Sequence, residues 1–352
     1  MNKNSRHDPG IDALKGLAII FVVLIHVIAV AFSNLSPKSP TWNLALTLDQ
    51  LSRFSVPLFI ALSGYSLAIN FNLETHWPDF YFRRLFKLLP IYIFWSLVTY
   101  LLISTLGNWP NYQQDLPILP ALIYGKVDYH LYFVPMIFQL YLLFPLIYKL
   151  TKIGKLKVVL VVLVWQAAFY FYISRLVETV SQNLTLSDQN QYLFFGTWIF
   201  YFIFGIYSQL YPNLLKIIGK KSLLAILIFL GYSIFSTNNI FNQYSSILLA
   251  TRFTKVSVLL YAIAMIIFLL NVRQLISKFN FGLLLKIGQV SFLIYLVHVM
   301  VLRAVNIFFL PTDGPSLVLV FFLTTGLSFL LALIISNVSK MLTGFVKQTK
   351  LI

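Results

Sequence analysis

Long stretches without any charged residue dominate the chain. A helix that crosses a bilayer needs roughly 20 apolar residues, and about ten of the gaps between charged residues are long enough to hold one. These gaps are Gly16–Pro37, Phe54–Leu73, Leu88–Gln114, Tyr129–Tyr148, Val158–Ser174, Gln189–Leu215, Ser222–Thr251, Val256–Val272, Ile287–Leu302 and Pro315–Ser339. The pattern predicts an all-α integral membrane protein with about ten transmembrane helices, in a single domain over residues 1–352.

The composition excludes several classes of protein. Hydrophobic residues make up 59% of the chain and charged residues only 10%, whereas soluble domains are typically about a quarter charged. There is no Cys, which excludes disulfides, thiolate metal sites and thiol nucleophiles. The sequence also has no Walker loop, no GxSxG and no cluster of metal-ligating residues. We therefore expect neither an ATP-driven pump nor a metalloenzyme.

The positive charges lie mainly on alternate loops. The net charge is +16, and most of the 26 Lys and Arg residues lie on the side that also carries both termini. The opposite side carries only Lys38, Arg53, Lys126, Arg175, Arg252, Lys255 and Arg303. Because cytoplasmic loops are enriched in Lys and Arg, both termini are predicted to be cytoplasmic. This distribution explains the positive net charge without a nucleic-acid partner. The composition, rich in Lys, Asn and Ile, is typical of a low-GC bacterium, so we expect the protein in a bacterial cell membrane.

The first apolar stretch carries two ionisable residues on one face. His26 follows Lys15 by eleven residues, which turn an α-helix through about 1,100° and separate the side chains by about 16 Å along the axis. Asp12 lies on the same face and can pair with Lys15. Ionisable residues at membrane depth indicate function by default. The structural alternative is a topogenic lysine plus a histidine that bonds a neighbouring helix.

A second histidine is expected at the same depth. His298 lies twelve residues past Lys286 in the ninth stretch, so we expect it to be level with His26. Tyr295 lies nearly one turn earlier on the same face. The structural alternative for His298 is a hydrogen bond between two helices.

Two further groups lie in the second and third stretches. Ser63 is expected near mid-membrane, although the pair Ser63-Gly64 also fits simple close packing of helices. Arg83, Arg84 and Lys87 precede the third apolar stretch. Arginine binds phosphate through two parallel hydrogen bonds, so this block is a candidate phosphate site. Topology signalling and contact with lipid headgroups are the alternatives.

An aromatic segment begins the fourth stretch. His130 and Tyr132 lie next to Asp128, on the side predicted to be outside. The aromatics fit an interfacial belt, and the alternative is that His130 faces a substrate from outside.

Taken together, five sequence blocks resemble the membrane acyltransferase 3 family. The first has a basic residue, ten further residues and then a histidine. In order along the chain, the blocks are Ile11–His26, Val56–Tyr65, Arg83–Pro90, His130–Val134 and Gly288–His298. Two positions depart from the family pattern, since Lys15 replaces the commoner Arg and Tyr132 replaces the usual Trp. The segment Phe195–Gly205 further resembles the branch that contains the intercellular adhesion protein C.

The resemblance implies an acyltransferase that uses cytoplasmic acyl-CoA as co-substrate, with no permanently bound cofactor and no metal. The acceptor it implies is a hydroxyl of a cell-surface or lipid-linked glycan. The interpretation gives the chemistry to His26 as general base, whose ordinary pKa suits proton exchange at neutral pH. The other candidate catalytic residues are Lys15, His298, Ser63 and Tyr295.

The remaining candidate contacts are with the two substrates. Donor contacts are assigned to Arg83, Arg84, Lys87 and Lys15, and acceptor contacts to His130 and Tyr132. Acetyl and succinyl donors both fit, as do direct transfer and a covalent acyl-histidine. The rival functions are a polysaccharide exporter or flippase with the same fold, and a structural subunit of a synthase.

Overall fold

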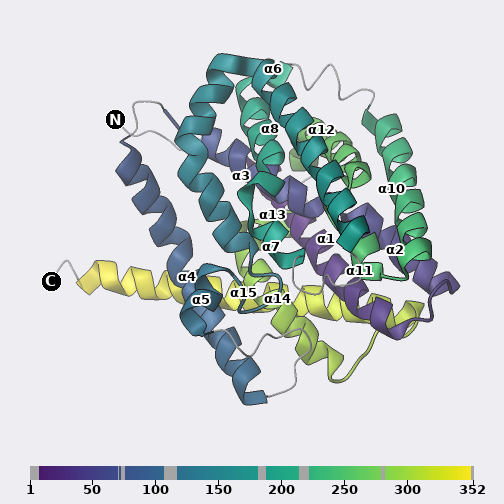
Figure 1. Cartoon of the computed structure of the whole chain (residues 1–352). Coiled ribbons are helices and arrows are strands. Elements are labelled where there is room, and N and C mark those ends of the chain that lie inside the picture. Colours follow the sequence, from purple (N-terminus) through teal and green to yellow (C-terminus); the bar gives the residue numbers. More distant parts are fainter. Residues whose placement is uncertain are drawn as a thin grey trace. The chain divides into compact units, whose positions relative to one another are not determined.

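The computed structural model describes residues 8–69, 71–72, 76–106, 117–180, 188–213, 222–278 and 282–349. All the regular elements in these ranges are helices. Seven of the described helices are long and apolar enough to cross a membrane, or up to eight if one sharply bent pair counts as a single span. The predicted class, an all-α integral membrane protein, is therefore confirmed (Figure 1).

The chain forms two compact units. Among the described residues, the terminal unit contains residues 9–55 and 273–349, and the central unit contains residues 56–272. The helices of the terminal unit are α1 (Pro9–Asn34), α2 (Pro40–Ser52), α13 (Gly282–Gln289), α14 (Ser291–Asn306) and α15 (Gly314–Thr349). Helix α1 packs against each of the other four, so it forms the core of this unit.

Two glycines let α1 and α13 approach backbone to backbone. A Cβ atom on Gly288 would lie 1.8 Å from the carbonyl oxygen of Asp12, and one on Gly16 would lie 2.3 Å from that of Leu284. No other residue type fits these positions without movement of the backbone. The contact fixes the start of α1, which carries Asp12 and Lys15.

A break at Val290 separates α13 from α14. The two helices meet at 81°, and Val290 has φ −107° and ψ 13°. The predicted ninth span, Ile287–Leu302, is therefore not one straight helix. Lys286 and His298 lie on opposite sides of the bend, so the depth of His298 cannot be derived from Lys286.

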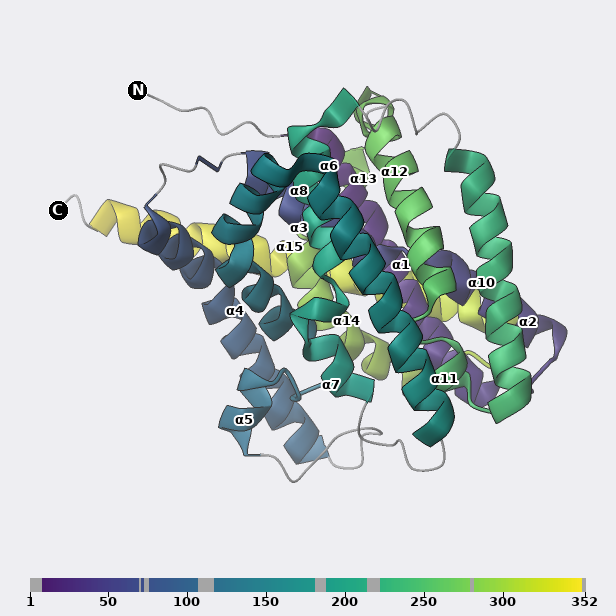
Figure 2. The ribbon, with the colours of Figure 1, turned by 45° about the horizontal axis from the view of Figure 1, so that its top comes forward.

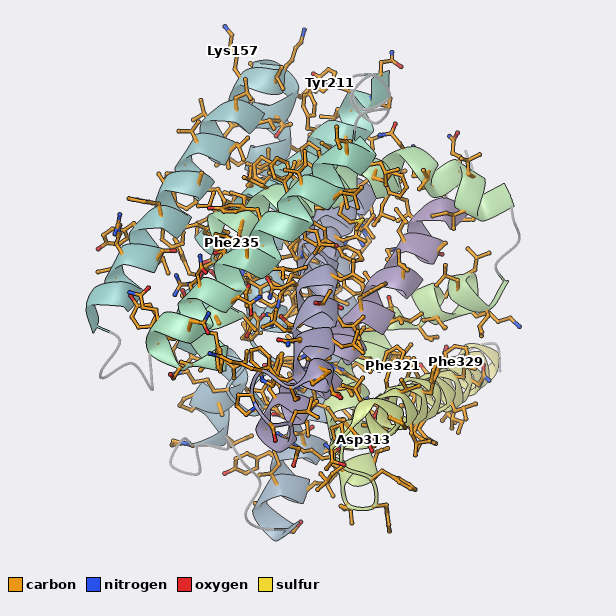
Figure 3. All side chains as sticks on the ribbon, turned by 90° about the vertical axis from the view of Figure 1, so that its right-hand side faces the viewer. Lys157, Tyr211, Phe235, Asp313, Phe321 and Phe329 are labelled. Atoms are coloured by element: carbon orange, nitrogen blue, oxygen red, sulfur yellow. The ribbon has the colours of Figure 1, made fainter. Side chains whose placement is uncertain are left out.

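Helix α15 begins with reciprocal hydrogen bonds between Asp313 and Ser316. The carboxylate of Asp313 accepts the backbone N–H of Ser316 at 2.8 Å, and the Ser316 hydroxyl accepts the N–H of Asp313 at 3.0 Å. Hydrogen bonds from Ser316 lower the pKa of the Asp313 carboxyl below its ordinary value. Figure 3 shows Asp313 at the start of α15, with Phe321 and Phe329 further along it.

The central unit contains the remaining helices. They are α3 (Ser55–Ile69), α4 (Trp77–Leu106), α5 (Ile118–Ile123), α6 (Phe133–Val180), α7 (Asp188–Leu193), η1 (Phe195–Thr197), α8 (Ile199–Leu210), α10 (Ser222–Tyr244), α11 (Ile247–Ala250) and α12 (Val256–Lys278). Helix α6 is broken at Lys155, where φ is 48° and ψ is −131°. Its two parts run in opposite directions (Figure 2).

Close packing and aromatic contacts organise the central unit. A Cβ atom on Gly64 of α3 would lie 2.3 Å from the carbonyl oxygen of Phe202 in α8, so the packing interpretation of Gly64 is confirmed. Phe80 of α4 stacks on Phe144 of α6 with ring centroids 5.3 Å apart. These contacts hold the first turns of α4, which carry the basic block, against α6.

One predicted loop and one predicted span differ from the structure. Residues 38–53 were expected as a loop, but α2 occupies Pro40–Ser52, with the hydroxyl of Ser39 accepting the backbone N–H of Trp42. The segment Gln189–Leu215 was expected as one span, but it contains α7, η1 and α8. Helix α8 has only 12 residues, fewer than the roughly 20 of a full crossing.

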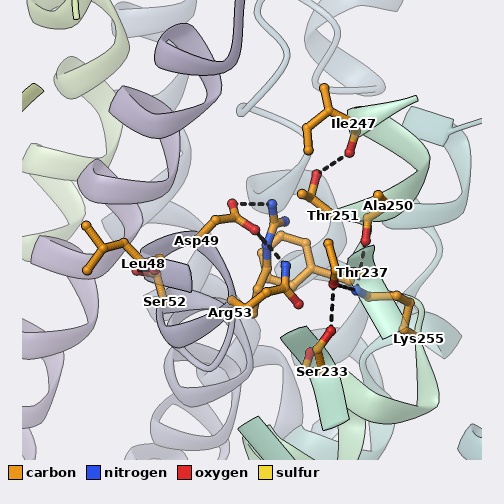
Figure 4. A network of polar contacts seen from close by, with 12 residues as sticks. Leu48, Asp49, Ser52, Arg53, Ser233, Thr237, Ile247, Ala250, Thr251 and Lys255 are labelled. Atoms are coloured by element: carbon orange, nitrogen blue, oxygen red, sulfur yellow. Dashed lines mark hydrogen bonds and ion pairs between the residues drawn. The ribbon is translucent and has the colours of Figure 1, made fainter. Parts of the chain in front are cut away.

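Three cations assigned to loops are in fact buried. Arg53, Arg252 and Lys255 are 7%, 4% and 3% exposed. Lys255 donates hydrogen bonds to the hydroxyl of Thr237 and, at 2.8 Å, to the carbonyl oxygen of Ala250 (Figure 4). Arg53 and Lys255 therefore make contacts inside the protein, and the burial of all three cations weakens their use as loop charges.

Candidate functional site

The first candidate residues lie together on α1. Lys15 and His26 share this continuous helix, as predicted from the sequence. The ammonium group of Lys15 lies 3.3 Å from the carboxylate of Asp12, which confirms the expected pairing. Both partners keep some exposure, at 29% for the Lys15 side chain and 11% for Asp12.

The two histidines predicted at mid-membrane meet in the terminal unit. The ring centroids of His26 on α1 and His298 on α14 are 5.0 Å apart, with an angle of 47° between the ring planes. His298 is fully buried and His26 is partly exposed. The sequence predicted that the two would be level, although it derived this from a straight helix that the structure replaces with a bend.

Backbone contacts determine which nitrogen of His298 carries a proton. Its Nδ1 lies 2.7 Å from the carbonyl oxygen of Tyr295 and 3.2 Å from that of Ile294. A carbonyl oxygen only accepts hydrogen bonds, so Nδ1 donates and must carry the proton. In the neutral ring, Nε2 is then an acceptor. A neutral His298 in this tautomer cannot donate a hydrogen bond from Nε2 to a thioester oxygen.

Tyr295 lies beside the histidine pair. Its ring centroid is 6.1 Å from that of His298, and its ring stacks on Phe292 at the same distance. The side chain is partly exposed. Tyr295 thus contributes a carbonyl that orients His298 and a phenol on the same helix.

Ser63 belongs to the central unit, where it shares a hydrogen bond with Tyr141 of α6. Arg84 also acts electrostatically on Tyr141. The structure therefore brings Ser63 together with one member of the basic block, through a tyrosine that the sequence analysis did not single out.

The basic block lies in the first turns of α4, ahead of the apolar stretch that begins at Leu88. Arg83 is exposed, while Arg84 is partly buried with its guanidinium carbon 5.9 Å from the centroid of the Phe80 ring. Lys87 follows on the same helix, but its side chain lies outside the described part of the structure. Figure 3 shows Lys157 of α6 and Tyr211, which directly follows α8. Tyr211 donates a hydrogen bond to the carbonyl oxygen of Lys152 at 3.0 Å.

The proposed acceptor residues lie just before α6. His130 is only 4% exposed, and its Nδ1 lies 3.9 Å from a carboxylate oxygen of Asp128. Tyr132 is partly exposed, and its ring centroid is 5.7 Å from that of Tyr192. The aromatic segment thus presents Tyr132 and Tyr192 together, while His130 has a buried acidic neighbour.

The sequence analysis missed a buried ion pair in the terminal unit. Asp49 and Arg53 are separated by four residues and form a salt bridge with an N–O distance of 2.6 Å. Their i, i+4 spacing is the helical ion-pair spacing. The sequence hides the pair because Arg53 borders a charge-free stretch, which predicts a loop position for it.

Comparison with known proteins assigns the chain to a family. No curated protein and no solved structure matches it. The sequence model of the acyltransferase domain of the acyltransferase 3 type matches residues 8–337, which is nearly the whole chain. The match covers both units, including the helices that carry Lys15, His26 and His298. The chain therefore belongs to the acyltransferase 3 family and is a membrane acyltransferase.

Proposed function

We propose that this acyltransferase moves an acyl group, acetyl or succinyl, from acyl-CoA to a hydroxyl of a cell-surface or lipid-linked glycan. The observation that carries the proposal is the contact between the imidazoles of His26 and His298, whose centroids are 5.0 Å apart. Two histidines from different helices are a costly arrangement inside a membrane unless they serve chemistry or specific pairing.

In the proposed reaction, His26 acts as the general base. It takes the proton of the acceptor hydroxyl as the hydroxyl oxygen bonds to the thioester carbon. The π electron pair of the carbonyl moves onto the acyl oxygen. The electron pair on the acyl oxygen then returns and re-forms the C=O bond as the C–S bond breaks. The departing sulfur receives the proton from His26. The products are an ester and the free thiol of CoA.

The role of His298 in this proposal follows from its fixed tautomer. Its Nδ1–H is anchored on the Tyr295 carbonyl, which holds the ring against His26. We assign His298 to positioning His26, instead of donating to the thioester oxygen. Tyr295 and Ser63 stay candidates for contact with the acyl oxygen, which needs a donor as it gains charge.

The proposed donor contacts combine charge with partial burial. The Arg84 guanidinium beside the Phe80 ring is well suited to a phosphate, because Arg presents several N–H groups in a fixed plane. Arg83 and Lys87 add charge to the same part of α4, and Lys15 is assigned to the pantetheine arm. His130 and Tyr132 are retained for the acceptor, with Tyr192 added because its ring lies beside Tyr132.

We also propose ten crossings, with both termini in the cytoplasm of a bacterial cell. The break at Lys155 supports two crossings within α6, because 48 helical residues would extend about 72 Å, more than twice the hydrocarbon thickness. Burial of Arg53, Arg252 and Lys255 removes three cations from the opposite loops, which strengthens the Lys and Arg asymmetry. The resemblance of Phe195–Gly205 to the adhesion protein C branch stays a prediction.

The proposal is tested by transfer with the purified full chain in proteoliposomes. Acetyl-CoA and succinyl-CoA are supplied separately, with an N-acetylglucosamine pentamer as acceptor. Released CoA is measured with a thiol reagent, and the chain itself gives no background because it has no Cys. Thiol release that depends on the pentamer, with the acyl group recovered on the sugar, is expected. Absence of thiol release with both donors contradicts the proposal.

A further inference from the structure

A buried ion pair joins α2 to the turn that follows it. The guanidinium of Arg53 donates from Nε to Oδ2 of Asp49 at 2.9 Å and from Nη2 to Oδ1 at 2.6 Å. The side chains are 9% and 2% exposed. Gln50 donates a further hydrogen bond to Oδ2 of Asp49 at 2.8 Å. Figure 4 shows this two-pronged contact, which fixes the orientation of the guanidinium.

Stability alone is a weak reason for such a pair. Desolvation of two charges often outweighs their attraction, and replacement of a buried pair by apolar residues of similar volume is often neutral or stabilising. Ionisable residues at membrane depth are candidates for function. A buried Arg that a carboxylate holds in a single orientation is a preorganised positive charge.

Ring contacts put this pair level with the histidines. Phe32 of α1 lies against Trp42 of α2, with centroids 5.6 Å apart. Phe21 of α1 lies against Phe54, just past α2, at 5.1 Å. The two segments therefore run antiparallel, and His26 lies about midway between the two contacts along α1, at the level of Asp49.

Electrostatics support the same placement. In the described part of the chain, His298, Arg53 and Arg303 lie close enough to act electrostatically on the His26 ring. Arg303 lies near the end of α14, five residues after His298, and is partly exposed. Of the two arginines, only Arg53 is both nearly buried and held by the two-pronged contact with Asp49.

We infer that Arg53, oriented by Asp49, supplies the positive charge that stabilises the acyl oxygen during the transfer. The inference rests on the proposed function. When the acceptor oxygen bonds to the thioester carbon, the carbonyl π pair moves onto the acyl oxygen, whose negative charge faces the guanidinium. When the C–S bond breaks, that pair returns to the C=O bond and the charge disappears. A fixed cation lowers the barrier because it needs no reorientation as the charge develops.

The test replaces the pair by apolar residues of similar size. Asp49→Leu combined with Arg53→Met removes both charges, so no buried charge is left unpaired. We expect a folded protein with the elution profile and unfolding midpoint of the wild type or better. We expect kcat for transfer from acetyl-CoA to the N-acetylglucosamine pentamer to fall by about 100-fold or more, with the KM for acetyl-CoA unchanged. A purely structural pair predicts wild-type kcat, and that result would overturn the inference.

A matched control and a second variant complete the design. Lys255→Met removes a different buried cation and should keep the kcat of the wild type per folded molecule; an equal loss there would also overturn the assignment. If the double variant does not fold, Arg53→Lys decides. It keeps the charge but loses the two-pronged contact, so at least a tenfold loss of kcat is expected, and unchanged kcat overturns the inference. Failure of the wild type to release thiol contradicts the proposed function itself, which separates the two failures.

Discussion

The backbone contact between α1 and α13 gives a sharp prediction for Gly288→Ala. The added methyl carbon would lie 1.8 Å from the carbonyl oxygen and 2.6 Å from the carbonyl carbon of Asp12, and 3.0 Å from the backbone nitrogen of Gly16. Ordinary van der Waals contact begins at 3.4 Å, so the two helices must separate by more than an ångström. All three atoms belong to helix backbone, which cannot move aside as a flexible side chain can.

The expected cost follows from this geometry. Overpacking of a well-packed core typically costs about 1–3 kcal/mol, and a contact between two backbones places Gly288→Ala at or above the upper end. The matched control is Gly326→Ala in α15 of the same unit, where an added Cβ meets nothing within 4 Å. An exposed helical Gly→Ala change stabilises by roughly 0.5–1 kcal/mol.

Thermal unfolding of the two purified variants in detergent checks this prediction. The midpoint should fall by several degrees in Gly288→Ala and stay level or rise in Gly326→Ala. Acyl transfer should fall as well in Gly288→Ala, because the displaced carbonyl belongs to Asp12, the ion-pair partner of Lys15. Equal midpoints for wild type and both variants would refute the described packing of α1 on α13.

Two other predictions concern the basic block and the start of α15. Arg84→Ala should raise the KM for acetyl-CoA about tenfold or more, with a smaller change in kcat, because a phosphate contact is lost. Arg83→Ala, at an exposed position, should have a weaker effect. Equal KM values for wild type and Arg84→Ala would contradict the assignment of a phosphate contact to Arg84. Asp313→Ala should lower the unfolding midpoint at neutral pH. Since the folded pKa of Asp313 is lowered, the capping contribution is present above the ordinary Asp pKa and is lost as the pH falls through the folded value. The midpoints of wild type and Asp313→Ala should therefore converge in strong acid, and a constant difference at every pH would contradict the cap.

Local helix geometry made part of the site predictable. Lys15, Asp12 and His26 lie on one uninterrupted apolar helix, so their shared face follows from the number of residues between them. His298 was recognised by its depth and its surroundings in the sequence. Its contact with His26 depends on the bend at Val290, and no Pro near this residue signals a break.

Helix α2 and its ion pair were not predicted because charged residues were used to mark the ends of helices. Arg53 ends a charge-free gap, so the preceding segment was read as a loop, although Trp42, Ala45, Leu46 and Asp49 have helical spacing and are buried on α2. The sequence shows Asp49 four residues before Arg53, but only the packing shows that both are buried. The same reading split α6 correctly near Lys155, where positive charges and a true break coincide.

The most direct test of the account is transfer by His26→Ala compared with His76→Ala. His76 is an exposed histidine that pairs with Asp79, so its change controls for loss of an imidazole elsewhere in the chain. Both proteins should elute and unfold like the wild type. The account predicts that His26→Ala releases no CoA thiol from acetyl-CoA above the rate without protein, while His76→Ala keeps the wild-type rate. Transfer by folded His26→Ala at the wild-type rate would contradict the assignment of His26 as the base.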